Sequence, residues 1–172
     1  MEALTDLYEG AGQQAYDRVE GDAASLRRSL MLLNSQFVRS TTLYIHGLAA
    51  VASLDALPPA RRMARVVRAG VLAMRLGREG MGWTDTLCSI LSAAVANARG
   101  ERTSAIARLR EAIERAERVD MSLYAAAARH QLGLALGGEA GDRLVEQSVG
   151  VMRAQDVRRP ERFAAMLVPG RW

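Results

Sequence analysis

An arginine stripe on the predicted helix over residues 60–76 is the feature of the sequence best suited to bind a ligand. Four arginines lie close to one face of this helix: Arg61, Arg65, Arg68 and Arg75. No acidic residue occurs between Ala56 and Glu79 to neutralise them. Because each guanidinium offers paired N–H donors, the stripe is a candidate site for nucleic acid, an acidic peptide or an acidic domain. A solvated basic face in an arginine-rich chain is the simpler alternative.

The opposite face of the same helix is apolar. It carries five side chains at helical spacing: Met63, Val66, Val67, Val71 and Met74. This spacing predicts that they pack into the core. No aromatic residue is interleaved with the arginines, so the stripe lacks the stacking platform typical of single-stranded nucleic-acid binding.

Residues that could act in catalysis or metal binding are few and scattered. Cys88 is the only cysteine and falls on the apolar face of its predicted helix, which favours an inert core thiol. His46 and His130 are solitary, no HExxH pattern occurs, and one cysteine with two histidines is a poor zinc set. The glycine-rich segment 77–82 lacks the preceding strand of a dinucleotide site. We therefore expect no catalytic residue, no metal, no cofactor and no enzyme activity.

Composition excludes several enzyme classes and a membrane span. The chain has 172 residues, which fit one domain, and it contains no lysine. A Walker-type phosphate loop, a protein kinase and Schiff-base catalysis each need a lysine. No apolar run approaches the roughly 20 residues that span a bilayer. The acidic start "MEALTDLYEG" lacks the basic segment of a secretion signal, and with a single cysteine we expect a cytoplasmic protein.

Helical periodicity runs through most of the chain and predicts an all-α fold. Six segments form three antiparallel pairs: 35–54 with 59–76, 84–99 with 101–119, and 122–136 with 139–155. Thr84 and Ser122 are the expected N-caps of their helices, and Gly100 separates the two helices of the second pair. Laying Gly100–Glu101 on Gly138–Glu139 superposes large apolar residues on large ones, which indicates a two-helix repeat of the kind found in helical solenoids.

Shorter helices are predicted at both ends. Near the start they cover residues 3–9, 12–20 and 23–33, so the first unit looks unfinished, as in a C-terminal fragment of a longer protein. At the other end, Pro160 opens a helix over 160–167. Its apolar residues are expected to cover the open end of the stack: Phe163, Met166 and Leu167.

The repeat pattern resembles degenerate tetratricopeptide repeats. The matching pieces are "GERTSAIARLREAIERA" (100–116), "QLGLAL" (131–136) and "IHGLAA" (45–50). The C-terminal half, with "DMSLYAAAARHQLG" and "VMRAQDVRRPERFAAMLVPG", is similar to the tail of multidomain signalling proteins of myxobacteria and their relatives, serine/threonine kinases and related ATPases. The unit lengths are uneven, and the aromatic that starts a typical first helix is missing from the final unit.

The resemblance implies a single domain, an α-solenoid of helix hairpins. About nine helices would stack right-handedly in units of roughly 1–34, 35–80, 81–120 and 121–158, with a C-terminal cap over 159–172. First-helix residues would line a concave binding face, and four are candidates for contact with a partner: Thr41, Tyr44, Asn97 and His130.

The expected function is non-catalytic scaffolding through protein–protein interaction, as the C-terminal part of a bacterial signalling protein such as a serine/threonine kinase. The partner would be a protein, a peptide or another domain of a longer parent chain, and no membrane. The alternative is an anion- or nucleic-acid-binding helical module that uses the arginine stripe. An unfinished first repeat would also leave apolar surface for a homodimer.

Overall fold

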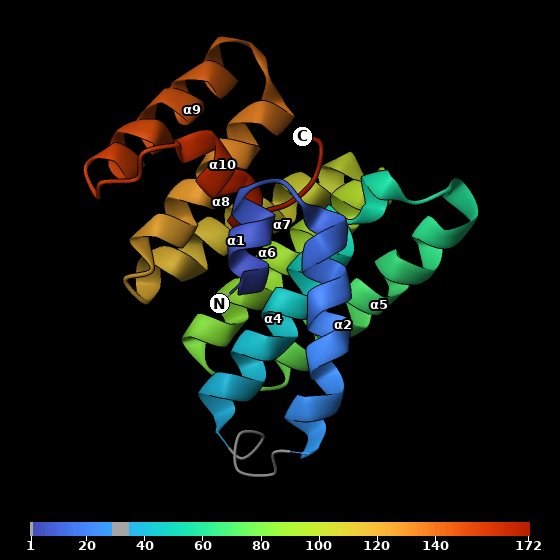
Figure 1. Ribbon diagram of the computed structural model, residues 1–172. Helices are drawn as coiled ribbons and strands as arrows, with labels where there is room; N and C mark the ends of the chain where they lie inside the picture. The colour runs from blue at the N-terminus through green and yellow to red at the C-terminus, as the bar shows by residue number, and fades with distance from the viewer. Residues whose placement is uncertain (1, 29–34) are drawn as a thin grey trace.

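Figure 1 shows the computed structural model, which describes residues 2–28 and 35–172. These residues form nine α-helices and one short 3-10 helix, without a strand. In chain order the elements are α1 (Glu2–Tyr8), α2 (Gly12–Arg28), α4 (Gln36–Ala52), η1 (Leu54–Ala56), α5 (Pro59–Gly77), α6 (Gly82–Ala98), α7 (Arg102–Arg118), α8 (Ser122–Leu136), α9 (Gly138–Arg153) and α10 (Pro160–Leu167). The predicted all-α fold class is confirmed for this part of the chain.

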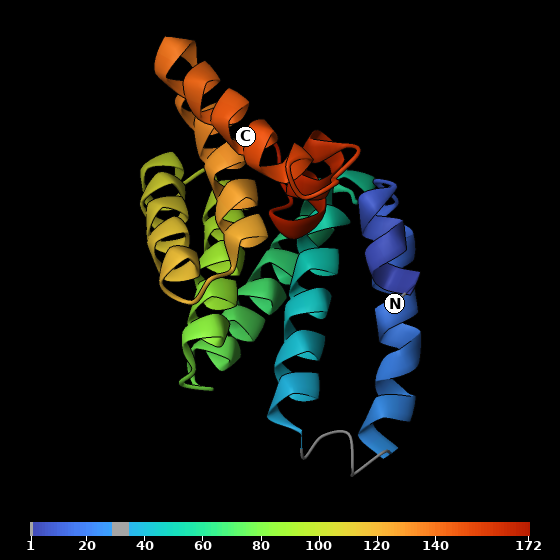
Figure 2. The same ribbon diagram turned by 90° about the vertical axis from the view of Figure 1, so that its left-hand side faces the viewer.

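Three helix pairs make up the body of the molecule: α4 with α5, α6 with α7, and α8 with α9. Each helix packs most extensively on its neighbours along the chain, and the first helices α4 and α6 also pack on each other. Figure 2 shows these pairs following one another, with α1 and α2 beside α4. The pairs coincide with the predicted ones to within about two residues at most ends, whereas the handedness of the stack stays a prediction.

Small residues in the interior let the helices approach closely. The four alanines of 125–128 are at most 3% exposed, and Ala93 and Ala94 of α6 are fully buried. One close approach joins α8 to α9, where a Cβ atom on Gly133 would lie only 2.6 Å from the carbonyl oxygen of Gly141. The backbones of these two helices are therefore in direct contact, which only glycine permits.

Two predicted helix starts differ from the structure. Helix α6 begins two residues before Thr84, with Met81 as its N-cap residue. The Thr84 hydroxyl accepts a hydrogen bond from the Met81 backbone N–H at 3.2 Å and donates one to the Met81 carbonyl at 2.8 Å, so it reaches back from inside the first turn. Ser122 is the first residue of α8 rather than its cap, which is Met121.

The N-terminal part contains fewer breaks than predicted. We expected separate helices over 12–20 and 23–33, but α2 continues without interruption through residues 21 and 22 to Arg28. Gly21 causes no break because a single glycine costs a helix only about 1 kcal/mol. The predicted segment 29–33 lies outside the described residues.

The C-terminal helix α10 has the predicted bounds but not the predicted place. It packs mainly on α8 and on α1, and only slightly on α9, the last helix of the stack. In Figure 2 it lies between the α8–α9 pair and the α1–α2 pair, on the same side of the molecule as α4. It therefore lies mainly against α8 and α1, and its contact with α9, at the end of the stack, is the smallest of the three. Among the described residues, no helix is both long and apolar enough to cross a membrane.

Candidate functional site

The C-terminal segment, residues 160–172, lies across the first helices of the three pairs. We call the side of α4, α6 and α8 that it covers the inner face. Each of these helices donates one side-chain hydrogen bond to a main-chain carbonyl of the segment. The Tyr44 hydroxyl donates to Leu167 at 2.9 Å, Gln131 Nε2 to Val168 at 3.2 Å, and Asn97 Nδ2 to Arg171 at 3.0 Å. The inner face thus holds a peptide by its backbone.

These carbonyls are free to accept hydrogen bonds because they lie at or beyond the C-terminal end of α10. The last carbonyls of a helix have no partner within the helix, and Leu167 is the final residue of α10. Beyond it the chain leaves the helical conformation, with φ −133° and ψ 73° at Val168. Tyr44 and Gln131 supply donors at this point, and the indole N–H of Trp172 also donates to the Val168 carbonyl at 3.2 Å.

Apolar anchors hold the same segment against the inner face. Pro160, Ala164 and Leu167 of α10 are buried, at the four- and three-residue spacing of a helix that places one face in a groove. Val168 is completely buried. The segment therefore combines a short amphipathic helix with a non-helical tail, both bound through side chains of the inner face.

A buried histidine lies next to this contact. His130 of α8 is 3% exposed, and neither of its ring nitrogens has a hydrogen-bond partner among the described residues. Burial lowers the pKa of the imidazole below its ordinary value, while the charge of Glu161 raises it in part. The charged form would lose its hydration here, so the neutral imidazole is the form that fits the packed inner face.

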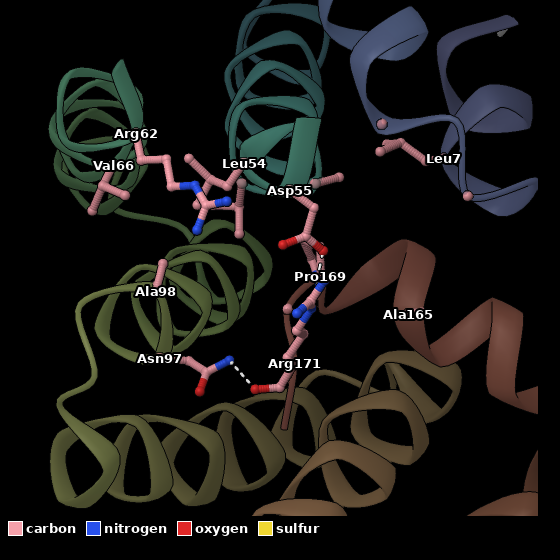
Figure 3. Close-up of a pocket in the computed structure, with 15 residues that line it drawn as sticks. Leu7, Leu54, Asp55, Arg62, Val66, Asn97, Ala98, Ala165, Pro169 and Arg171 are labelled. Atoms are coloured by element: carbon pink, nitrogen blue, oxygen red, sulfur yellow. Dashed lines mark hydrogen bonds and ion pairs between the residues drawn. The ribbon is translucent and has the colours of Figure 1, made fainter. Parts of the chain in front are cut away.

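A pocket of about 310 Å³ continues the site beyond Val168 (Figure 3). Arg171 crosses it: its carbonyl accepts the bond from Asn97, and its guanidinium Nε lies 3.2 Å from Asp55 Oδ2. Arg62 points into the pocket from α5 and donates from Nε to the Leu57 carbonyl at 3.0 Å. The lining holds one carboxylate and no serine, cysteine or histidine. The carboxylate of this lining, Asp55, is the one that contacts Arg171.

The structure brings together three of the four predicted contact residues. Tyr44, Asn97 and His130 all lie on the inner face against or beside the C-terminal segment. Thr41 is half-buried on α4, one turn before Tyr44, and takes no part in these bonds. Gln131 was not among the predicted contact residues, although it is a polar residue on the alanine-rich stretch of α8 that packs closely in the interior.

The arginine stripe is divided between two environments. Arg65 and Arg68 face α2, where the Arg65 guanidinium lies 3.5 Å from the centre of the Tyr16 ring and Arg68 Nη1 donates to the Tyr16 hydroxyl at 2.9 Å. Arg68 also forms an ion pair with Glu20. Arg61 and Arg75 are exposed. Two of the four arginines therefore contact side chains of α2, although Arg68 itself stays 43% exposed.

The predicted core face of α5 is wrong, with one exception. Val66 is buried, but the other four residues are exposed: Met63 by 59%, Val67 by 50%, Val71 by 39% and Met74 by 53%. The helix instead buries Val66, Ala69, Leu72, Ala73 and Leu76. Compared with the predicted orientation, α5 is turned about its axis. Arg65 and Arg68 contact α2, and the stripe of larger apolar residues points outward.

The remaining candidates for chemistry stay apart. Cys88 is half-buried, and burial raises the pKa of its thiol above the ordinary value. Within the described residues, no group of three or more potential metal-ligating side chains occurs. Comparison with protein-family models, with curated proteins and with solved structures gives no match for this chain.

Proposed function

We propose that this chain is a non-catalytic protein–protein interaction module whose inner face binds a peptide segment of a partner. One observation carries the proposal: Tyr44, Asn97 and Gln131, on three successive first helices, all donate to main-chain carbonyls of one segment. Side chains that donate to the peptide backbone can bind peptides of many sequences. Neighbouring apolar sites then select which apolar side chains of the peptide fit. The C-terminal segment is then a built-in ligand that a partner must displace.

The resemblance to repeat regions of signalling proteins supports a wider setting for this role. In a serine/threonine kinase of the kind described above, the module would be the C-terminal part and would bring a partner to the catalytic domain. The binding of Arg65 and Arg68 to α2 side chains favours the peptide-binding proposal over an anion-binding stripe. Exposed Arg61 and Arg75 remain as separate charges rather than a continuous site.

Photo-crosslinking tests the proposal directly. Benzoylphenylalanine at Thr41, beside the inner face, is expected to capture peptides of specific partner proteins from host lysate. Because Tyr44 holds the peptide backbone, Tyr44→Phe combined with Gln131→Leu should lower the yield of captured partner. The matched control places the same probe at exposed Glu146 on α9. Crosslinks from Thr41 to the chain's own C-terminal segment alone, whatever the lysate, would contradict the proposal.

A further inference from the structure

A second surface of the molecule lies on α5, α6 and α7, away from the inner-face contacts. A groove of about 420 Å³ runs between α5 and α7, with its floor on α6. Val67, Val71 and Met74 line its α5 side, and Cys88, Ser92 and Val95 belong to its floor. We call this the outer groove. Its apolar α5 side is the stripe that the periodicity wrongly assigned to the core.

The spacing on α5 indicates the shape of the occupant. Met63, Val67, Gly70 and Met74 follow one another at intervals of four, three and four residues. These are the intervals of the seam by which one helix packs along another. Gly70, in the middle of the seam, leaves α5 without a side chain where Val95 and Arg99 lie within 4 Å of the Cβ position. A second helix laid along α5 therefore matches this surface better than an extended strand.

The charges on the rim indicate the chemistry of the occupant. Arg99 and Arg108 line the groove, and Arg78 brings its Nη2 to 4.0 Å from the Met74 sulfur at the α5 edge. Glu101 is the one carboxylate among the lining residues. Glu111, further along α7, is paired with Arg108 and Arg115. The positive charge of the rim exceeds its negative charge.

We infer that the outer groove binds an amphipathic helix of a partner protein, with apolar residues on one face and carboxylates beside them. A second copy of this chain fits less well, because two arginine-lined rims would face each other. A lipid surface also fits less well, since the seam lies along a groove whose other wall is α7. The inference concerns a different surface from the peptide site and does not depend on it.

Fluorescence anisotropy with the full chain and a labelled synthetic peptide tests the inference. The probe is a helix of about three heptads with leucine at the seam positions and glutamate beside them. A control peptide replaces every glutamate by lysine. We expect the acidic peptide to bind at least about tenfold more tightly than the basic one, because the rim carries excess arginine.

Two variants locate the binding. Val67→Asp places a charge in the seam and should weaken the acidic peptide by about tenfold or more, while Leu134→Asp, at an exposed apolar residue of α8, should leave it unchanged. Arg99→Glu should weaken the acidic peptide and strengthen the basic one. Circular dichroism confirms that each variant keeps its helices, which is expected because Val67 and Arg99 are exposed.

Several results would overturn the inference. These are absence of binding by the acidic peptide, equal binding by Val67→Asp, or equal affinity for the two peptides. Binding to phosphatidylserine vesicles in place of the peptide, lost in Val67→Asp, would assign the groove to membranes. Self-association lost in the same variant would assign it to a second copy. Tyr44→Phe should not change the peptide affinity, so failure here is separable from failure of the inner-face proposal.

Discussion

His130 shows how a single residue makes the inner face sensitive to its protonation state. The ring is buried without hydrogen-bond partners among the described residues, and burial lowers its pKa. In the unfolded chain the same group titrates near pH 6.5. Below that pH the unfolded chain binds a proton that the folded chain does not, so folding loses stability as the pH falls.

We therefore predict that the free energy of unfolding decreases between about pH 7 and pH 5. The loss should be largely absent in His130→Leu, which keeps an apolar group of similar size in the site. Urea unfolding of both proteins at several pH values measures the difference. His46→Leu is the comparison, because it removes the other histidine, whose ring lies 4.0 Å from the Glu20 carboxylate instead of inside the inner-face contact. Parallel pH profiles for His130→Leu and the unchanged chain would contradict the prediction.

At the residue scale, the place of a residue in the helical repeat could be predicted from the sequence, whereas the burial of its side chain could not. Tyr44, Asn97 and His130, which the repeat pattern predicts as partner contacts, lie against or beside the chain's own C-terminal segment, and their contact with a partner stays a prediction. That these residues meet the chain's own C-terminus could not be predicted. The Tyr44 bond joins residues 123 positions apart, and local sequence carries no record of such a pairing.

Helix α5 illustrates what periodicity can and cannot predict for an element. The spacing correctly identified the helix and grouped its apolar residues on one face. It could not identify which face a neighbour covers, and here Arg65 and Arg68 on the arginine side contact Tyr16 and Glu20 of α2. The core side is built from smaller residues such as Ala69 and Ala73. Small residues carry a weak hydrophobic signal although they permit the closest packing.

The contact between α8 and α9 leads to a paired prediction. Gly133→Ala should destabilise the protein by about 1–3 kcal/mol, because the new methyl group would meet the Gly141 backbone. This cost outweighs the roughly 1 kcal/mol that alanine gains over glycine in a helix. Gly150→Ala, in α9 with nothing within 4 Å of the new Cβ, should instead stabilise by about 0.5–1 kcal/mol. Chemical denaturation compares the two, and changes of equal sign would refute the argument.

On the scale of the whole molecule, the two ends of the described chain meet. Helix α10 packs on α1, and Arg162 forms a 3.0 Å ion pair with Glu9 just beyond α1. The C-terminal segment also contacts α4, α6 and α8. An open stack transmits stability only between neighbours, whereas these contacts couple the first helix to the last.

Weakening one end should therefore loosen the other. Leu167→Ala removes a side chain that is 4% exposed and should cost about 2–5 kcal/mol. We expect faster amide hydrogen exchange in α10 and also in α1, more than 150 residues away in sequence. Ile113→Ala on α7 is the control, since its effect should remain near α6 and α8. Unchanged exchange in α1 upon Leu167→Ala would show that the ends behave independently.

Because the C-terminal segment belongs to the same chain as the inner face, a competing peptide needs a minimum concentration, relative to its dissociation constant, to displace it. A ligand attached through a short connection, such as residues 154–159 between α9 and α10, has an effective concentration of about a millimolar. If the segment alone binds the inner face with a micromolar dissociation constant, a free partner needs about a thousandfold excess over its own dissociation constant. The module would then ignore weak or scarce peptides and respond to tight binders or to partners held nearby. Arg162, Leu167 and Arg171 would set that threshold, because changing them alters the occupancy of the face by the segment while leaving its donors intact.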